Sequence, residues 1–204
     1  MFGDLFTLLF RPGNFFAQKQ NEEISLLIPA AIVGIGGVIS FFTPLLQITI
    51  IHGGRNNLYM ASPEGVIIFL ALPFIFWFFA SVLIWGICRL LSGTGSFTAT
   101  LQNCGYGYLP HTLLSPVVIV NGVVLSLRTA ASSMVLDSII LVLAIIPLLS
   151  LLWAGWLWTV AMEKTHMISR VRAMAGPGLV VLLYLAPLVL NIIQLWYVAR
   201  ALGQ

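Results

Sequence analysis

Charged side chains are scarce in this sequence. Aspartate, glutamate, lysine and arginine together make up 7% of the 204 residues, whereas an average soluble domain has about 25%. Apolar residues make up 60%, and the mean hydropathy is +1.05. This composition is typical of an integral membrane protein rather than a water-soluble one. We expect the chain to contact membrane lipids and to have no nucleic-acid partner.

Cysteine and histidine are also rare. The cysteines are Cys88 and Cys104, and the histidines are His52, His111 and His166. None of them has the CxxC or HExxH spacing of a metal site. Both cysteines fall at the ends of apolar stretches that we place in the cytoplasm, where thiols stay reduced. We therefore expect no metal, no cofactor and no disulfide.

Catalytic motifs are missing as well. The GTGS sequence at 93–96 lacks the lysine of a phosphate-binding loop, and no strand precedes it. His111 and Ser115 have the spacing of a base and a nucleophile on one helix face, but no GxSxG turn or orienting carboxylate accompanies them. An aspartyl intramembrane protease needs two carboxylates, and the apolar stretches contain one, Asp137. We predict that the chain is not an enzyme, with a hydrolase built on His111 and Ser115 as a remote alternative.

What the sequence does contain is long apolar stretches. A helix needs about 20 apolar residues to cross the hydrocarbon layer of a bilayer. Five stretches are long enough, and they lie at 24–51, 66–88, 104–127, 134–162 and 178–199. The predicted fold class is therefore all-α: an integral membrane bundle of five transmembrane helices over 24–204, preceded by a short N-terminal segment at 1–23.

The lysines and arginines between these stretches indicate an orientation. Six lie on the side of the N-terminus, namely Arg11, Lys19, Arg89, Lys164, Arg170 and Arg172. Three lie on the other side, namely Arg55, Arg128 and Arg200. Cations near spans are enriched on the cytoplasmic side. We expect a cytoplasmic N-terminus and an external C-terminus, in the cell membrane of a prokaryote or an endomembrane of a eukaryote.

The N-terminal segment has the pattern of an amphipathic helix. Its large apolar residues recur at the spacing of one helix face: Phe2, Leu5, Phe6, Leu9 and Phe10. Arg11 and Pro12 should end this helix, because proline disfavours helical backbone in the residue before it. The helix is too short to span, so we expect it to lie in the cytoplasmic interface with its phenylalanines in the acyl boundary. Packing on the bundle is the alternative.

Small residues and tryptophans predict how the helices are placed. Ala30, Gly34 and Gly37 on the first span would let another helix approach closely. We interpret them as contacts within the bundle, with a homodimer contact as the alternative. Trp156 and Trp158 approach the cytoplasmic end of the fourth span, where aromatic residues commonly lie at the headgroup level. They are expected to anchor that end in the interface.

Polar residues within the spans are few. They are His111, Asn121, Asp137, Asn191 and Gln194. Asp137 is expected to cap its helix or to pair with Arg128. The amides of Asn191 and Gln194 are three residues apart and most simply hold helices together. The alternative is that they line a polar path with His111 and Asn121.

One stretch interrupts the apolar pattern, and it carries a family resemblance. The sequence GTGSFTATLQNCGYGYLP at 93–110 resembles the signature of the Yip domain family, named for interaction with Ypt and Rab GTPases. The matching residues include Gly93, Gly95, Phe97, Gly105, Tyr106 and Pro110. EKTHMISRVRAMA at 163–175 and RPGNFF at 11–16 are similar to two other segments of that family. With only residues 1–23 before the first span, the chain looks like a short prokaryotic form, and the resemblance implies a fold and topology rather than GTPase binding.

The stretch NCGYGYLPHT at 103–112 should distort the start of the third span. Gly105 and Gly107 are expected to loosen its first turn, and Pro110 removes the hydrogen bond to the Tyr106 carbonyl. Irregular backbone at membrane depth must be covered by protein or trapped water. We therefore expect this broken helix to pack against a loop at 89–103 and a basic loop at 163–177, as a structural turn or as a binding surface.

The function that these patterns favour is a multi-pass membrane scaffold or adaptor in membrane organisation or trafficking. It would act through its cytoplasmic face on lipids or on a protein partner. The candidate contact residues are Phe2, Phe6, Phe10, Arg11, Lys164, Arg170 and Arg172. The alternative is a small transporter or channel with a polar site around the broken third helix.

Overall fold

Every element that the structure describes is a helix. The structure is a computed structural model, and it describes residues 2–52, 62–130 and 134–186. Its helices are α1 (Phe2–Phe10), α2 (Pro12–Lys19), α3 (Leu27–His52), α4 (Pro63–Leu90), α5 (Phe97–Gly107), α6 (Leu109–Ala130), α7 (Met134–His166) and α8 (Arg170–Ala173). A further helix covers 175–186. The predicted all-α class is confirmed for these residues.

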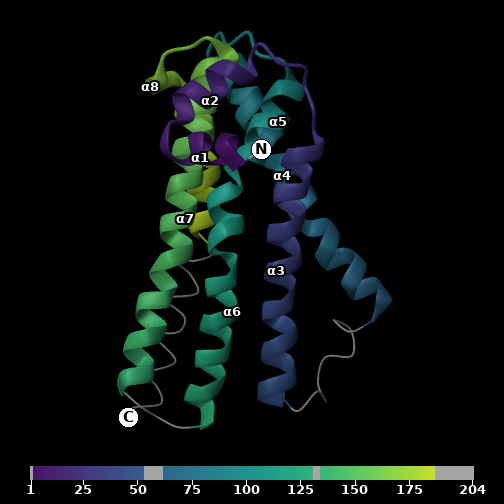
Figure 1. Cartoon of the computed structure of the whole chain (residues 1–204), viewed down its shortest axis with the longest axis vertical. Coiled ribbons are helices and arrows are strands. Elements are labelled where there is room, and N and C mark those ends of the chain that lie inside the picture. Colours follow the sequence, from purple (N-terminus) through teal and green to yellow (C-terminus); the bar gives the residue numbers. More distant parts are fainter. Residues whose placement is uncertain (1, 53–61, 131–133, 187–204) are drawn as a thin grey trace.

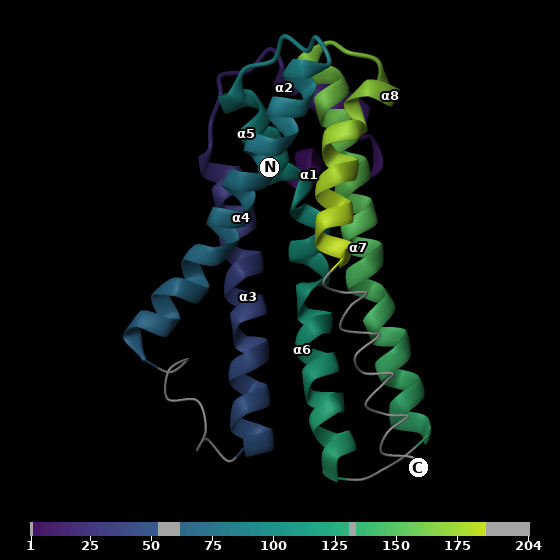
Figure 2. The ribbon, with the colours of Figure 1, turned by 180° about the vertical axis from the view of Figure 1, so that it is seen from behind.

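The long helices coincide with the predicted spans. Helices α3, α4, α6 and α7 cover the first four stretches, and the 175–186 helix covers the start of the fifth. In Figure 1 the long helices extend in one direction, while α1, α2, α5 and α8 gather at one end. Figure 2 shows the N-terminal half of α4 diverging from α3, and the 175–186 helix lying along α7.

Two of the described helices are long and apolar enough to cross a membrane. They are Pro63–Leu90, with a mean hydropathy of 2.7 over its most apolar window, and Ile145–His166, with 1.8. Only 22% of the apolar window of Pro63–Leu90 is buried within the molecule. A core helix of a soluble protein would be buried on most sides, so this exposed apolar surface fits contact with lipid. The other three spans remain predictions.

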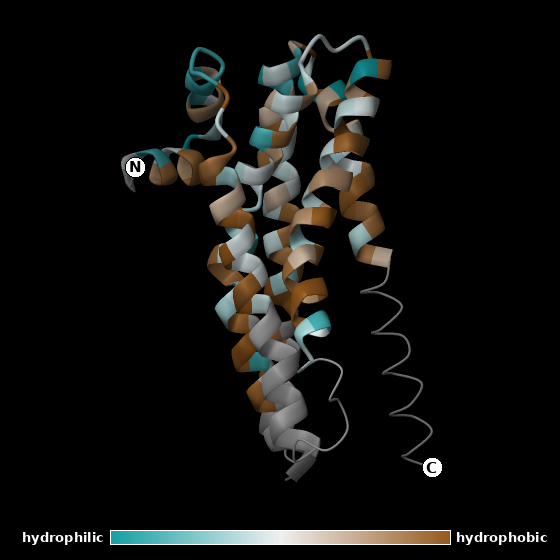
Figure 3. Ribbon diagram, turned by 90° about the vertical axis from the view of Figure 1, so that its right-hand side faces the viewer, coloured by the Kyte–Doolittle hydropathy of each residue, from teal (hydrophilic) through white to brown (hydrophobic). Residues whose placement is uncertain are grey.

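Small residues bring α3 and α4 together. A β-carbon added at Gly34 would lie 3.2 Å from Phe74 Cζ, and one added at Gly37 would lie 2.5 Å from Pro73 Cγ. The first span therefore uses these glycines for packing within the bundle, as predicted. The homodimer contact stays a prediction. Figure 3 shows hydrophobic residues along the lengths of the helices and hydrophilic ones gathered toward the end that carries α2.

The predicted loop at 89–103 is wrong in its second half, because α5 begins at Phe97. Ser96 caps this helix: its backbone is extended and its side chain accepts a hydrogen bond from the Ala99 N–H at 3.2 Å. The helix ends at Gly107, and α6 begins after one turn residue, Tyr108. The predicted break is confirmed, but Gly105 and Gly107 lie in regular helix rather than in a loosened turn.

Pro110 occupies a favourable position in this arrangement. It is the second residue of α6, where backbone N–H groups have no partner within the helix. The Tyr108 N–H bonds the Gly105 carbonyl at 3.1 Å, and the Thr112 N–H bonds the Tyr108 carbonyl at 3.1 Å. Proline therefore starts α6 rather than breaking a continuous helix.

The C-terminal end of α4 is closed by a tight backbone turn. The Gly93 N–H bonds the Cys88 carbonyl at 2.8 Å, and the Ser92 N–H bonds the Arg89 carbonyl at 3.1 Å. Ser92 has a φ of 70°, which is the left-handed conformation that this turn requires. The turn directs residues 93–96 back across the end of the bundle, toward the end of α7.

Candidate functional site: the cap of the bundle

The family-like segments meet at one end of the molecule. We call this region the cap and define it as α1, α2, α5 and residues 163–174. Helices α1 and α2 lie beside the bundle, toward the end at which α5 and α8 also lie (Figures 1 and 3). The cap is the part of the described structure in which the most widely separated segments of the chain are joined.

Helix α1 has two apolar sides. Leu8 is fully buried, and Leu5 and Leu9 pack against the core. Phe6 and Phe10 are 63% and 64% exposed, and their ring centroids lie 4.5 Å apart. The single face predicted from the sequence is therefore divided: the leucines pack on the bundle, and the two phenylalanines point outward. The side chain of Phe2 lies outside the described residues.

Helix α2 is joined to α5 through aromatic rings. It begins at Pro12, directly after Arg11, and buries Phe15 and Phe16. The Phe15 ring lies edge-on to Tyr106 with a centroid distance of 5.1 Å. The Lys19 ammonium lies 5.7 Å from the Phe15 centroid and 5.8 Å from that of Tyr106. Such cation–π contacts contribute about 0.5–1 kcal/mol at exposed sites.

The charge of Lys19 is held in place by its surroundings. Its ammonium forms an ion pair with Glu22 at 2.5 Å. Burial lowers the pKa of Lys19, but the hydrogen bond to Glu22 and nearby negative groups together raise that pKa above its usual range. The lysine therefore stays protonated at neutral pH.

Two tryptophans hold α5 from the side. The Trp158 indole N–H donates to the Cys104 carbonyl at 2.8 Å, and the Trp77 N–H donates to the Leu101 carbonyl at 2.9 Å. The glycines of α5 make room for these rings: a β-carbon at Gly107 would overlap the Trp158 ring, and one at Gly105 would lie 3.0 Å from Trp77. The prediction that Trp158 anchors the interface is wrong, because it is 2% exposed.

His166 lies at the centre of the cap. It is fully buried at the end of α7, and its Nε2 lies 3.0 Å from the Thr100 hydroxyl. The Thr94 N–H donates to the His166 carbonyl at 3.1 Å. A β-carbon at Gly93 would lie 2.6 Å from His166 Nδ1, and one at Gly95 would lie 3.0 Å from its Cγ. The two family-motif glycines therefore provide the space in which His166 sits.

Buried amides extend this network. The Asn103 side chain donates to the Thr165 hydroxyl at 2.8 Å. The Gln102 side chain accepts from the Ser25 N–H at 3.0 Å, which ties α5 to the segment before α3. The predicted contact between the 103–112 stretch and the basic loop at 163–177 is thus confirmed at Asn103 and Thr165. It consists of hydrogen bonds between buried polar groups rather than of charge pairs.

Phe97 joins α5 to α4. As the first residue of the helix, it lies edge-on to Trp85 at a centroid distance of 5.9 Å and to Phe78 at 5.7 Å. The Trp85 indole N–H also donates to the Gly95 carbonyl at 3.3 Å. Aromatic pairs of this geometry contribute about 0.5–1.5 kcal/mol beyond area burial. This family-motif phenylalanine therefore has a packing role.

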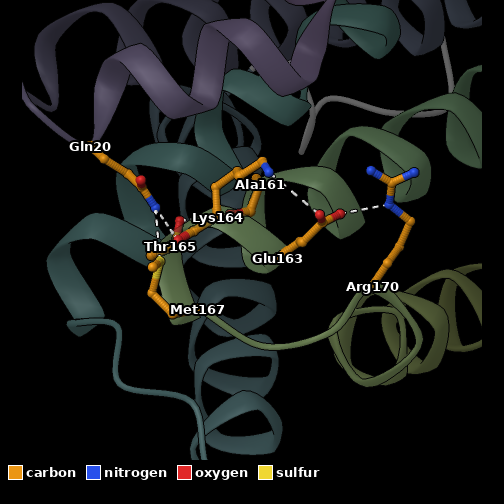
Figure 4. A network of polar contacts seen from close by, with 7 residues as sticks. All are labelled: Gln20, Ala161, Glu163, Lys164, Thr165, Met167 and Arg170. Carbon is orange, nitrogen blue, oxygen red and sulfur yellow. Dashed lines mark hydrogen bonds and ion pairs between the residues drawn. The ribbon is translucent and has the colours of Figure 1, made fainter.

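The cations of the cap differ in their partners. Arg170 Nε lies 2.6 Å from one Glu163 oxygen, and Lys164 Nζ lies 3.5 Å from the other (Figure 4). Arg170 also lies 5.4 Å from the Trp156 ring centroid. The Gln20 side chain donates to the Lys164 carbonyl, so α2 is joined to the end of α7. Arg172 is exposed and has no ion pair within the described part of the chain, so its charge is available to a partner.

The structure describes the side chains of two of the predicted polar residues of the spans, His111 and Asn121. His111 lies beside Tyr108 and Tyr184, whose hydroxyls are 3.2 Å apart. Asn121 lies further along α6, and its Oδ1 is buried without a hydrogen-bond partner in the described structure. The side chain of Asp137 and the residues Asn191 and Gln194 lie outside the described residues.

The Ser115 hydroxyl bonds the backbone of its own helix rather than His111. Pro116 has no N–H, so it leaves the Thr112 carbonyl without its helical partner. The Ser115 hydroxyl donates to that carbonyl at 2.7 Å. Among the described residues, no hydrogen bond joins Ser115 to His111. The serine therefore repairs the helix, and this arrangement does not support hydrolysis.

Sequence reasoning missed the buried polar residues of the cap. Thr100, Asn103, Thr165 and His166 lie within the family-like segments at 93–110 and 163–175, but the candidates from those segments were glycines, aromatic residues, Pro110 and the three cations. Polar residues in a short stretch indicate a loop unless their partners are known. One pattern could have indicated them: the segments at 93–110 and 163–175 combine several hydrogen-bonding side chains with glycine or small residues in an otherwise apolar chain.

Comparison with known proteins agrees with the residue patterns. The model of the Yip1 domain matches residues 6–191. An uncharacterized protein of the archaeon Methanocaldococcus jannaschii is 31% identical over 117 residues, which cover 53% of this chain and 80% of that protein. No solved structure matches the chain. Because the domain model covers α2 to the 175–186 helix and most of α1, the chain belongs to the Yip1 domain family.

Proposed function

We propose that this chain is a non-enzymatic, multi-pass membrane scaffold or adaptor that acts through the cap. In this proposal five helices cross the membrane and the cap lies on the cytoplasmic side. The observation that supports it most is the construction of the cap: buried hydrogen bonds join α5 to the end of α7 and to the segment before α3, and α2 packs on α5 through aromatic rings. A surface fixed in this way can present side chains to a partner without first becoming ordered.

Apolar and cationic side chains are among the outer side chains of the cap. Its exposed apolar residues include Phe6, Phe10, Met167, Val171 and Met174. The segment that carries Met167, Val171 and Met174 also contains the cations Lys164, Arg170 and Arg172. Arg11 directly follows α1. Apolar side chains next to cations fit an anionic headgroup layer or the acidic face of a protein. This combination supports the choice of the cap as the contact surface.

Replacing Arg172 by glutamine should weaken the binding of the cap to anionic membranes. A cation near such a surface contributes about 1 kcal/mol, which corresponds to about a fivefold change in affinity. The protein in neutral nanodiscs would be mixed with vesicles containing phosphatidylserine, and the bound fraction measured by flotation. Glu163→Gln is the matched variant: it removes the carboxylate that pairs with Arg170 and Lys164, so binding should become stronger. Equal binding of both variants and wild type would remove the lipid contact from the proposal.

The orientation of the cap can be tested by labelling an introduced cysteine. Val171 is 78% exposed on α8, whereas Cys88 and Cys104 are fully buried and should give little background. A membrane-impermeant maleimide should label Val171→Cys only after sealed cells are permeabilised. Labelling in intact cells would place the cap outside and reverse the proposed topology. The control is the protein that keeps Val171 and has Cys88 and Cys104 changed to serine, so that it contains no cysteine.

A transporter is the second candidate, and one observation favours it. His111 lines two adjoining cavities between the helices. Asn121 lines neither of them, and the described residues around these cavities include no aspartate, glutamate, lysine or arginine. A path for a polar or charged solute needs more polar groups along its length. We therefore prefer the scaffold. Solute flux into reconstituted vesicles that is reduced by His111→Ala is the result that would favour transport.

A further inference from the structure

Three cavities adjoin one another within the bundle. Their volumes are about 310, 180 and 140 Å³. Tyr184, on the 175–186 helix, lines all three, while Tyr108 and His111 line both smaller ones. The largest cavity alone reaches the lower end of the range of about 300–1,000 Å³ that is usual for small-molecule sites. The shared residues place the three cavities side by side around Tyr184.

The largest cavity is an apolar groove between α4 and the 175–186 helix. Phe76, Phe79 and Leu83 line it from α4, and Val180 and Leu183 line it from the other helix. The two helices touch on one side of the groove, where a β-carbon at Gly176 would lie 3.1 Å from Ile84 Cα. The groove lies in the middle of the most apolar helix of the described structure. At that depth, its surroundings are hydrocarbon rather than water.

The inner end of the groove is polar. The hydroxyls of Tyr108 and Tyr184 are 3.2 Å apart, so one of them donates to the other and one hydrogen remains for a further acceptor. His111, on the wall of both smaller cavities, makes no hydrogen bond with any described residue. A neutral imidazole offers one donor and one acceptor. Unused hydrogen-bonding groups therefore face the two smaller cavities, and one of these groups, on Tyr184, also borders the apolar groove.

We propose that this space is an intramembrane binding site for a neutral single-chain lipid. The chain would lie in the groove of α4, and a hydroxyl or carbonyl headgroup would bond to Tyr108, Tyr184 and His111. A carboxylate or phosphate does not fit, because no lysine or arginine is found among the described residues that line the cavities, and an unpaired charge is costly at this depth. The site is separate from the cap, so the inference does not depend on the proposed function.

Photolabelling of the full chain can test this site. The protein would be reconstituted in phosphatidylcholine vesicles with a monoacylglycerol whose chain carries a diazirine and an alkyne, and labelled peptides identified by mass spectrometry. We expect labels concentrated at 76–83 and 180–184, and competition by unlabelled monoacylglycerol. A fatty acid with the same chain, ionised at the pH of the experiment, should label these positions several times less.

Two pairs of variants separate the groove from its polar end. Leu183→Trp should fill the groove and abolish the concentrated labelling, whereas Ile67→Trp changes an exposed residue of α4 outside the groove and should not. Tyr184→Phe removes one hydroxyl and should lower labelling by about two- to tenfold, the loss expected for one hydrogen bond. Tyr106→Phe, whose ring lies in the cap, is its control.

Different results would contradict different parts of the proposal. Labels spread evenly along the exposed side of α4, or unaffected by Leu183→Trp, would show ordinary contact with bilayer lipid and overturn the site. Equal labelling by the fatty acid, unaffected by Tyr184→Phe, would overturn the neutral headgroup and its polar end. Because Arg172→Gln should leave the labelling unchanged, a failure here is distinguishable from a failure of the cap as a contact surface.

Discussion

Replacing Trp158 by alanine is expected to lower the free energy of unfolding by about 3–5 kcal/mol, the usual loss for truncating a large buried aromatic residue. Trp158 is 2% exposed, and its ring lies against Gly107 and edge-on to Tyr108 at a centroid distance of 5.5 Å. The change would leave a cavity at the point where α5, α6 and α7 meet. Neighbouring rings held by their own contacts cannot collapse fully into it.

A lost hydrogen bond adds to this effect. The Cys104 carbonyl belongs to the last turn of α5, where carbonyl groups have no partner within the helix. The Tyr108 N–H that could reach it bonds the Gly105 and Tyr106 carbonyls instead. The indole N–H of Trp158 is therefore the donor to the Cys104 carbonyl. Leaving a buried carbonyl unpaired costs about 1–3 kcal/mol.

Thermal unfolding of the purified protein in one detergent would measure the loss. For a chain of this length the midpoint should fall by about 6–20 °C for 3–5 kcal/mol. Trp156→Ala is the matched control, since Trp156 lies two residues away on α7, is 48% exposed and contacts Arg170. Trp156→Ala should lower the free energy of unfolding by only about 0.5–1 kcal/mol, the contribution of an exposed cation–π contact. Similar shifts for both variants would mean that Trp158 does not hold the cap together.

The positions of the long helices could be predicted because apolar length is a local property. The stretches at 24–51, 66–88 and 134–162 each correspond to one helix, with bounds that differ by four residues or fewer. Bounds differ where the helix continues past its apolar part, as α7 does through Glu163 to His166. Hydropathy reports only the part of a helix that matches lipid, so the polar extensions that build the cap were not visible.

Helix α5 could not be predicted in the same way. Its sequence, FTATLQNCGYG, combines polar residues and glycines, which locally favour a loop. It is helical because Trp77 and Trp158 pack into the space left by Gly105 and Gly107. Its buried amides find partners far away in the chain, as Gln102 does at Ser25. These contacts join residues tens of positions apart, and no local pattern in the sequence encodes them.

The charged residues of the cap show a different limit of prediction from the sequence. Counting lysines and arginines assigns each the same weight, and Lys164, Arg170 and Arg172 were predicted to act together. In the structure Glu163 pairs with the first two, so only Arg172 keeps a charge without a partner among the described residues. Glu163 is one position before Lys164, but its reach to Arg170 depends on the turn at Met167, whose φ is 55°. That turn was not predictable from the composition of the loop.

Replacing Gly93 by alanine should also destabilise the cap strongly. The added β-carbon would lie 2.6 Å from His166 Nδ1 and 2.7 Å from the Cys88 carbonyl oxygen. Overpacking of this kind costs about 1–3 kcal/mol, and occasionally more. The carbonyl belongs to the turn that ends α4, so it cannot move without loss of the bond from the Gly93 N–H. Gly178→Ala is the control, since no atom lies within 4 Å of its added β-carbon.

A double-mutant cycle distinguishes two reasons for a glycine at this position. If Gly93 provides room for the His166 ring, Gly93→Ala should cost less in a His166→Ala background than in the wild type, although the overlaps with the Cys88 carbonyl and with the β-carbon of residue 166 would remain. If Gly93 were needed for its backbone conformation, the two changes would add without coupling. The structure favours the first reason, because Gly93 does not have a left-handed φ. If the losses of stability of the two single variants, measured by thermal unfolding, simply add in the double variant, the packing of Gly93 against His166 would be contradicted.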